Sequence, residues 1–240
     1  MTLLDNLKQK VSSYLAGEYT KVRKTSVPSP EDIPLGNSAA ELEATTLFID
    51  VRQSSDITNA FRQQTAAKMM KAYFDGSVRI ISSNHGVVRS FNGDGMLAVF
   101  MGGGRSNNAV KAAMQTKWFV EEVLRSQFNK YFSNNQAAVG KALDFSIGAG
   151  LDEGTIFAVR VGVKGTNDVA WVGRCTNTSA KLANSTSSPR SIAITREVYS
   201  RLRQDRTHSG HAHMWTDEAM REIGGVTRAV RSTSYRWPIG

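Results

Sequence analysis

The sequence lacks the cysteines that a fold held together by disulfides needs. Cys175 is the only cysteine among 240 residues, so no disulfide can form within the chain. A domain of this size buries about 70–75% of the surface that its unfolded chain exposes, so it can fold without covalent staples. A single thiol is typical of a protein in a reducing compartment, and we expect the cytoplasm.

Long hydrophobic runs are also missing. A membrane-spanning helix needs about 18 or more consecutive apolar residues, and the sequence contains no such stretch. The first residues, MTLLDNLKQKV, include Asp5 and have no uninterrupted apolar segment, which argues against a secretory signal. We therefore expect no membrane partner.

Acidic residues are few relative to basic ones. The chain has 21 Asp and Glu against 30 Lys and Arg, which gives a formal net charge of +9. A positive excess favours an anionic partner, either a nucleotide or a larger polyanion. The basic residues are scattered and are not regularly interleaved with aromatic ones, so we expect no nucleic-acid partner and favour a small anionic substrate.

The prolines divide the chain into two parts. Three of the five lie within residues 18–43, which we interpret as a linker. Residues 1–17 before it are predicted to form an amphipathic helix capped by Thr2, with an apolar stripe at Leu4, Leu7, Val11 and Tyr14. Two interpretations of this helix stay open: packing on the main domain, or contact with a partner. We expect the catalytic domain to span residues 44–240.

From residue 44 onward, strands alternate with helices and hairpins. The predicted strands are 45–51, 86–92, 96–102, 143–151, 155–162, 169–173 and 191–195, with Asp-Glu-Gly at 152–154 as a hairpin turn. The predicted helices are 54–74, 106–131 and 176–184. This mixture of hairpins and crossover helices predicts an α+β fold with a mainly antiparallel sheet flanked by helices.

Two aspartates stand where such a fold can bring them together. Asp50 lies in the motif Phe-Ile-Asp-Val-Arg, which ends a predicted strand, and Asp94 lies in the Asn-Gly-Asp-Gly turn of a hairpin. Two facing carboxylates can hold two divalent cations ~3.5–4 Å apart, one activating an attacking hydroxyl and the other neutralising a triphosphate. Oxygen ligands suit Mg²⁺ and Mn²⁺ alike. Each aspartate alone would also fit ordinary turn or strand-end chemistry.

Three motifs in order resemble the catalytic domain of class III nucleotidyl cyclases over roughly residues 44–237. The family patterns are F-x-D-[IV], G-D-x-x-[LM]-A and G-x-x-V-N-x-A-x-R. They correspond here to Phe48–Val51, Gly93–Ala98 and Gly173–Lys181. The resemblance implies the class III cyclase fold, a nucleoside triphosphate substrate, and a head-to-tail homodimer with two sites.

The resemblance also implies a role for individual residues. Asp50 and Asp94 match the metal aspartates, and Val51 matches the residue whose backbone carbonyl joins them. Phe48 belongs to the same motif and is expected to contact substrate. Asn177 matches the asparagine that orients the ribose.

Two basic positions complete the implied site. Lys181 replaces the family's transition-state arginine, keeping the charge but losing the bidentate fork. In the family one subunit supplies the metal ligands and the other supplies the Asn and Arg pair. A further cation should hold the triphosphate, and we favour Arg228 over Arg231.

The base is expected to be a pyrimidine. In the family, two positions choose the purine, and they are occupied here by Ser90 and Ala170, which match neither the adenine nor the guanine signature. A site built to hydrogen-bond one base rejects a base that leaves its groups unpaired. A one-residue bulge would turn Arg89 toward the base, where it could donate to O2 or O4 of uracil, which favours UTP over CTP. The alternative, that Arg89 points to the other face of the strand, stays open.

The compact chain is similar to the pyrimidine cyclases of Pycsar anti-phage systems. That similarity implies that infection triggers synthesis of a cyclic nucleotide, which activates a downstream effector. Two alternatives remain: an adenylate cyclase acting on ATP, and a degenerate cyclase that senses nucleotide without turnover. A palm-type polymerase or diguanylate cyclase lacks support, because the hairpin reads Asn-Gly-Asp-Gly rather than GGDEF.

Overall fold

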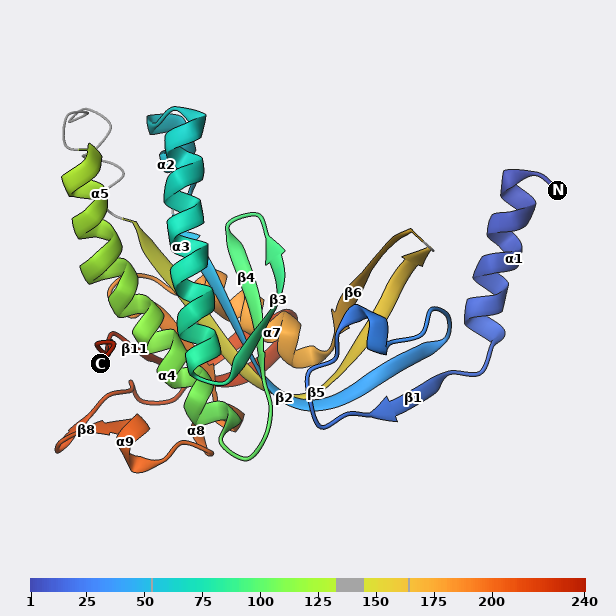
Figure 1. Cartoon of the computed structure of the whole chain (residues 1–240). Helices are drawn as coiled ribbons and strands as arrows, with labels where there is room; N and C mark the ends of the chain where they lie inside the picture. Colours follow the sequence, from blue (N-terminus) through green and yellow to red (C-terminus); the bar gives the residue numbers. More distant parts are fainter. Residues whose placement is uncertain (53, 133–144, 164) are drawn as a thin grey trace.

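A computed structural model describes residues 1–52, 54–132, 145–163 and 165–240 (Figure 1). A nine-stranded sheet forms its centre, with the main strand order β10-β11-β7-β5-β2-β4-β3; β1 pairs with β2, and β6 pairs with β5. Only the β1–β2 and β5–β7 pairs among these are parallel. The predicted α+β fold with a mainly antiparallel sheet is therefore confirmed.

Two long strands run through the middle of the sheet. β2 (Ser38–Arg52) and β5 (Ser146–Val163) pair antiparallel from Ala40↔Ala158 to Arg52↔Ser146. The other strands are β1 (Thr20–Arg23), β3 (Gly86–Asn92), β4 (Gly95–Phe100), β6 (Thr166–Val172), β7 (Ile192–Thr195), β10 (Ala219–Ile223) and β11 (Val226–Thr233). A separate hairpin joins β8 (His208–Ser209) to β9 (Ala212–His213).

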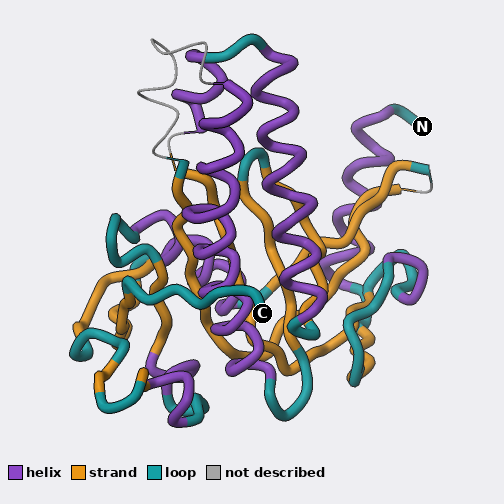
Figure 2. Tube along the Cα trace, turned by 60° about the vertical axis from the view of Figure 1, so that its left-hand side comes forward, coloured by secondary structure: helices purple, strands orange, loops and turns teal. Residues whose placement is uncertain are grey.

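Helices cover both faces of the sheet, as the tube in Figure 2 shows from a second side. The helices are α1 (Leu3–Ala16), α2 (Ser54–Ala60), α3 (Gln63–Ser83), α4 (Arg105–Trp118), α5 (Arg125–Phe132), α7 (Arg174–Ser185), α8 (Arg196–Tyr199) and α9 (Gln204–Thr207), with short η1 (Pro30–Asp32). The predicted helix 106–131 contains a π-helical stretch, η2 (Phe119–Leu124), between α4 and α5. The predicted helix 54–74 is interrupted after Ala60 and then continues to Ser83.

The linker prediction was wrong for two segments. Residues 38–43 belong to β2, and residues 20–23 form β1, which pairs with Ser38–Glu41. The three prolines lie between these strands, so they do not prevent a strand on either side. The sheet therefore begins before residue 44.

The predicted hairpin at 152–154 is also wrong. β5 runs unbroken through Asp152 and Glu153, which are buried at 0% and 6% exposure. Asp152 accepts a hydrogen bond from Thr195 Oγ1 at 2.7 Å, and Glu153 accepts one from Ser106 Oγ at 2.7 Å. Because Asp152 Oδ1 and Glu153 Oε2 have hydrogen-bond partners inside the protein, these acidic residues mark a strand interior and not an exposed turn.

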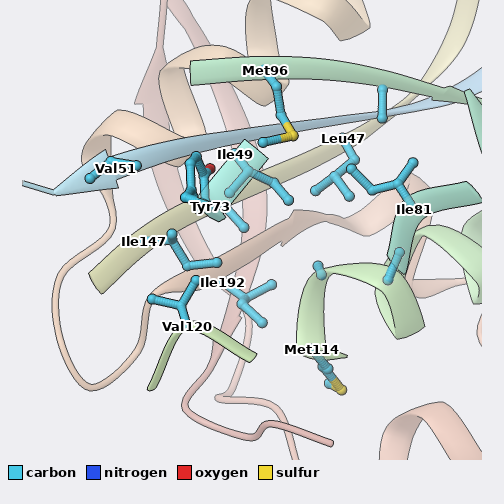
Figure 3. Packing of buried hydrophobic residues seen from close by; sticks show 14 of the residues in the cluster. Leu47, Ile49, Val51, Tyr73, Ile81, Met96, Met114, Val120, Ile147 and Ile192 are labelled. Carbon is cyan, nitrogen blue, oxygen red and sulfur yellow. The ribbon is translucent and has the colours of Figure 1, made fainter. Parts of the chain in front are cut away.

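The larger core lies between the sheet and α3, α4 and α5. Alternate β2 residues point into it, so Leu47, Ile49 and Val51 are buried beside Tyr73 of α3 (Figure 3). The intervening residues of β2, including Phe48 and Asp50, face the opposite side of the sheet. Burial of one β2 face thus fixes the direction of the residues on the other.

On that opposite side, α7 approaches β5 closely enough to touch its backbone. A Cβ added to Gly150 would lie 2.1 Å from Ser179 O and 2.5 Å from Ala183 N. We expect Gly150→Ala to lower the free energy of unfolding by about 2 kcal/mol, since backbone atoms cannot yield as a side chain can. Gly154→Ala is the matched control in the same strand, because its Cβ would lie at an ordinary 3.8 Å from Cys175 Sγ. Urea denaturation of both variants measures the difference, and equal stabilities would contradict this packing.

The N-terminal helix stands apart from the helices that cover the sheet (Figure 1). The predicted cap is confirmed, because Thr2 and Asp5 form a reciprocal capping box. α1 has no buried residue, and its stripe residues Leu4, Leu7, Val11 and Tyr14 are each more than half exposed. Of the two interpretations left open for this helix, the structure does not bury its apolar stripe on its own domain. None of the helices in the described ranges is long and apolar enough to cross a membrane.

Candidate active site

The two predicted aspartates lie side by side at the end of the β3–β4 hairpin. Asp50 of β2 pairs with Gly95 of β4, and Asp94 is in the adjoining turn. Gly93 in that turn has φ of 63°, a conformation that favours glycine. A Cβ on Gly95 would lie 2.9 Å from Asp50 Oδ1, so the absence of a side chain there lets the carboxylate lie against the hairpin.

The electrostatics of this pair fit a cation site. Burial, the negative charge of Asp94 and a hydrogen bond with its carboxyl raise the pKa of Asp50 to about 6, while Arg52 opposes the shift. Two such carboxyl groups repel when both are ionised, and a divalent cation between them removes that repulsion. Val51 points its side chain into the core, which leaves its backbone carbonyl as the group it can offer. The donor set of two carboxylates and a carbonyl suits Mg²⁺ or Mn²⁺.

No cluster of three or more His, Cys, Asp or Glu side chains that could hold a metal occurs in the described part of the chain. An Asp pair alone leaves most of the coordination shell of Mg²⁺ free. Such sites are usually completed by water and by substrate phosphates. The pair therefore fits a metal that arrives with a nucleotide better than a closed structural metal site.

A cavity of about 410 Å³ lies next to the Asp pair, between β2, β3, β6 and α7. It brings together four predicted substrate residues that are far apart in the sequence: Phe48, Ser90, Ala170 and Asn177. Sequence reasoning missed other residues of its lining, among them Asn92, Asp168, Trp171 and Thr176. Asn92 had a signal, because it lies two residues after Ser90 on the same strand face.

Ser90 and Asn92 form a polar edge of the cavity. Ser90 Oγ donates to Asn92 Oδ1 at 3.1 Å. With its oxygen engaged, the Asn92 amide keeps its NH₂ donors available, and the Ser90 oxygen can still accept. This edge can both donate to and accept from a ligand.

The predicted bulge is present, but it does not turn Arg89 into the cavity. The β3–β4 register shifts between Val88 and Ser90, so Arg89 is the extra residue. Its Nη2 donates to Val27 O at 3.3 Å, and Arg89 is not part of the cavity lining. The bulge is thus present, but the Arg89 side chain points away from the cavity. Its partner, the carbonyl of Val27, belongs to a segment whose sequence gives no sign of this contact.

Asn177 and Lys181 lie one turn apart on α7, as the spacing predicts. Both side chains are exposed, and Asn177 faces the cavity. The Lys181 ammonium lies toward the β10–β11 turn, because a Cβ on Gly224 would be 2.3 Å from its Nζ. Lys181 itself is not part of the cavity lining.

The two candidates for binding the triphosphate lie on β11 and are both engaged within the chain. Arg228 Nη1 is 3.6 Å from Glu197 Oε1. Arg231 Nη1 donates to Thr216 O at 2.8 Å, and its guanidinium stacks on the Tyr199 ring. Adjacent strand residues point to opposite faces, so Arg228 and Arg231, three apart, start from opposite faces of β11.

Within one chain, the predicted site therefore consists of two neighbouring groups of residues. We call the Asp50–Asp94 pair the predicted metal half, and the cavity with Ser90, Ala170 and Asn177 the predicted base half. Neither aspartate is part of the cavity lining.

No family model matches the sequence. A uridylate cyclase of Rhodovulum sp. (strain MB263) is 30% identical over 217 residues, which are 90% of this chain and 89% of the relative. A uridylate cyclase of Burkholderia cepacia is 29% identical over 243 residues and covers 100% of both chains.

The fold is similar to those of solved cyclases. A bacterial light-regulated adenylyl cyclase has a TM-score of 0.68 at 19% identity; the match covers 87% of this chain but only 56% of that one. The guanylate cyclase domain of RhGC from Catenaria anguillulae, solved with GTP, has a TM-score of 0.63 at 16% identity, with 83% and 100% covered.

Proposed function

The chain belongs to the class III nucleotidyl cyclases, among the uridylate cyclases, and we propose that it converts UTP into cyclic UMP and pyrophosphate at a site shared by two copies of the chain. The observation that carries this proposal is the Asp50–Asp94 pair beside a cavity with no purine-type partner at Ser90 or Ala170.

The reaction is an internal displacement at phosphorus. The ribose O3′ bonds to the α-phosphorus, the bond from that phosphorus to the β-phosphate oxygen breaks, and pyrophosphate leaves while the O3′ proton passes to solvent. Asp50, Asp94 and the Val51 carbonyl would hold one or two divalent cations, Mn²⁺ or Mg²⁺. When bound, these cations supply Lewis-acid stabilisation of the phosphate charge.

Residues of α7 position the substrate. The Asn177 amide at the cavity hydrogen-bonds the ribose and keeps O3′ in line with the phosphate. The Lys181 ammonium faces the charge that develops on the phosphoryl oxygens. As a point charge it stabilises this group less directionally than an arginine fork.

The resemblance to class III cyclases supports a homodimer, and neither aspartate is part of the cavity lining within one chain. In a head-to-tail arrangement, the Asp pair of one copy meets the cavity and α7 of the other, and the same contact repeated gives two equivalent sites. Each chain then contributes to both.

The polar edge of the cavity supports a pyrimidine. The Ser90 oxygen can accept from N3–H of uracil, and the Asn92 amide can donate to a ring carbonyl. Cytosine has no hydrogen on N3 at neutral pH, so this edge favours uracil. The names of the two relatives agree with UTP as the substrate.

The proposal is tested by incubating the purified protein with Mn²⁺ and each of ATP, GTP, CTP and UTP in separate reactions, with products identified by mass spectrometry. We expect cyclic UMP from UTP and no product from an Asp94→Asn preparation purified in the same way. Cyclic AMP or cyclic GMP as the main product would contradict our interpretation of Ser90, Ala170 and Asn92.

The resemblance to Pycsar cyclases supports a role in defence against phage, with cyclic UMP as the messenger to a separate effector. A pyrimidine messenger avoids receptors built to hydrogen-bond purines. Bacteria that carry the chain and its effector should resist phage, and Asp94→Asn should remove the resistance. Equal plaque numbers for the two strains would contradict the defence role.

A further inference from the structure

Arg52 is a half-buried cation beside Asp50 and Asp94, and the proposed mechanism assigns it no role. It follows Asp50 by two residues, so both side chains are on the same face of β2. Its guanidinium reaches across β5 to the C-terminal end of α7. There it donates to Ala183 O, to Asn184 O at 3.1 Å, and to Thr186 O and Oγ1 at 2.7 and 2.6 Å.

These contacts supply what α7 itself lacks. The last carbonyls of a helix have no partner within the helix, and a positive charge there is favourable to its dipole. α7 has no basic residue in its last turn. Arg52 of β2 therefore provides both the donors and the charge.

The sheet is shaped to admit this contact. Gly148 of β5 pairs with Asp50, and a Cβ on it would lie 2.2 Å from Arg52 Nη2 and 2.4 Å from Ala183 O. The Arg52 guanidinium and the C-terminal end of α7 thus meet directly over Gly148, the residue of β5 that pairs with Asp50. Any other residue at position 148 would push them apart.

We propose that Arg52 is a positioning residue that sets where α7 places Asn177 and Lys181 relative to the substrate. The inference rests on the proposed cyclase function and its shared site. Because α7 serves one site of the dimer and Asp50 serves the other, Arg52 also ties the two sites together through one chain. A shift of about 1 Å in a positioning group costs on the order of a hundredfold in rate.

The test distinguishes an effect of Arg52 through α7 from an effect on the neighbouring Asp pair. It does so by changing Arg52 on one chain of the dimer at a time. A heterodimer of an Asp50→Asn chain and an Asn177→Ala chain, purified through two different tags, has one complete site. The Asp50→Asn chain supplies its α7, and the Asn177→Ala chain supplies its Asp pair. We expect Arg52→Met on the first chain to lower kcat by on the order of a hundredfold with little change in KM, and on the second chain by less than about threefold. Arg52→Lys on the first chain should recover part of the loss.

Arg125→Met is the matched control, because Arg125 is also half-buried and donates from a helix to a backbone carbonyl, that of Phe145, at 2.8 Å on the opposite face of the sheet. A substitution that only lowers stability should reduce kcat equally whichever chain carries it. We expect this result for Arg125→Met. Equal loss from Arg52→Met on either chain, loss only on the chain that supplies Asp50, or no loss would overturn the proposal.

A second measurement does not need turnover. In the otherwise unchanged protein, Arg52→Met should speed hydrogen exchange of the amides in the last turn of α7 by on the order of tenfold, since it removes hydrogen bonds from a charged donor. Mn²⁺ should still bind to the variant, since Asp50 and Asp94 are intact. If hydrogen exchange in α7 is unchanged in Arg52→Met, the inference is overturned, even where the heterodimer is inactive. If exchange is faster in the variant but the heterodimer without the Arg52 change is already inactive, only the shared site is contradicted.

Discussion

Replacing Asp50 or Asp94 with asparagine is expected to lower cyclase turnover by about a thousandfold or more, since bound metal ions supply several kcal/mol of transition-state stabilisation. The fold should survive. Burial and the neighbouring Asp94 raise the pKa of Asp50 to about 6, which means that the folded protein disfavours the ionised form. Removing that charge in metal-free buffer should therefore leave the unfolding temperature unchanged or raise it.

Thermal unfolding with and without Mn²⁺ checks both parts of this prediction. The parent should gain stability when Mn²⁺ is added, because a ligand that binds only the folded state stabilises it. Asp50→Asn should lose most of that gain. Asp75→Asn, which removes an exposed carboxylate paired with Arg79, is the control and should behave as the parent. Full turnover in either active-site variant would refute the metal assignment.

Mixing two inactive variants is expected to restore activity. Asp50→Asn and Asn177→Ala each destroy both sites of a homodimer, but a heterodimer of the two has one intact site. With random exchange of subunits, half of the dimers are mixed and each has one of two sites, so on the order of a quarter of parental activity should return.

The control for mixing is Asp50→Asn with Asp94→Asn. Both changes fall on the metal half, and a shared site leaves every mixed dimer with a complete α7 pair but no complete Asp pair. Recovery with this pair, or none with the first pair once mixed dimers have been demonstrated, would contradict a site built from two chains.

The sequence was sufficient where the chemistry is local. The motif around Asp50, the two-residue turn at Asp94 and the spacing of Asn177 and Lys181 each lie within a few residues, so pattern and turn chemistry predicted their elements correctly.

The errors and omissions depend on contacts that are distant in the sequence. Asp152 and Glu153 resembled a turn because their partners, Thr195 and Ser106, are more than 40 residues away. Arg52 was missed because it donates mainly to backbone carbonyls about 131 residues further along the chain. Every residue has a backbone carbonyl, so the sequence does not indicate which of them accepts the bond. The grouping of Ser90 and Asn92 with Trp171 required the fold of β3 against β6.

The most direct test of the central claim is a competition. The parent protein is given equal concentrations of ATP, GTP, CTP and UTP with Mn²⁺ in one reaction, and the cyclic products are separated and quantified by mass spectrometry while little substrate has been consumed. We predict that cyclic UMP exceeds each other cyclic nucleotide by at least about tenfold, the ratio that one well-formed hydrogen bond in the base pocket provides. A cyclic purine nucleotide as the main product would contradict the account.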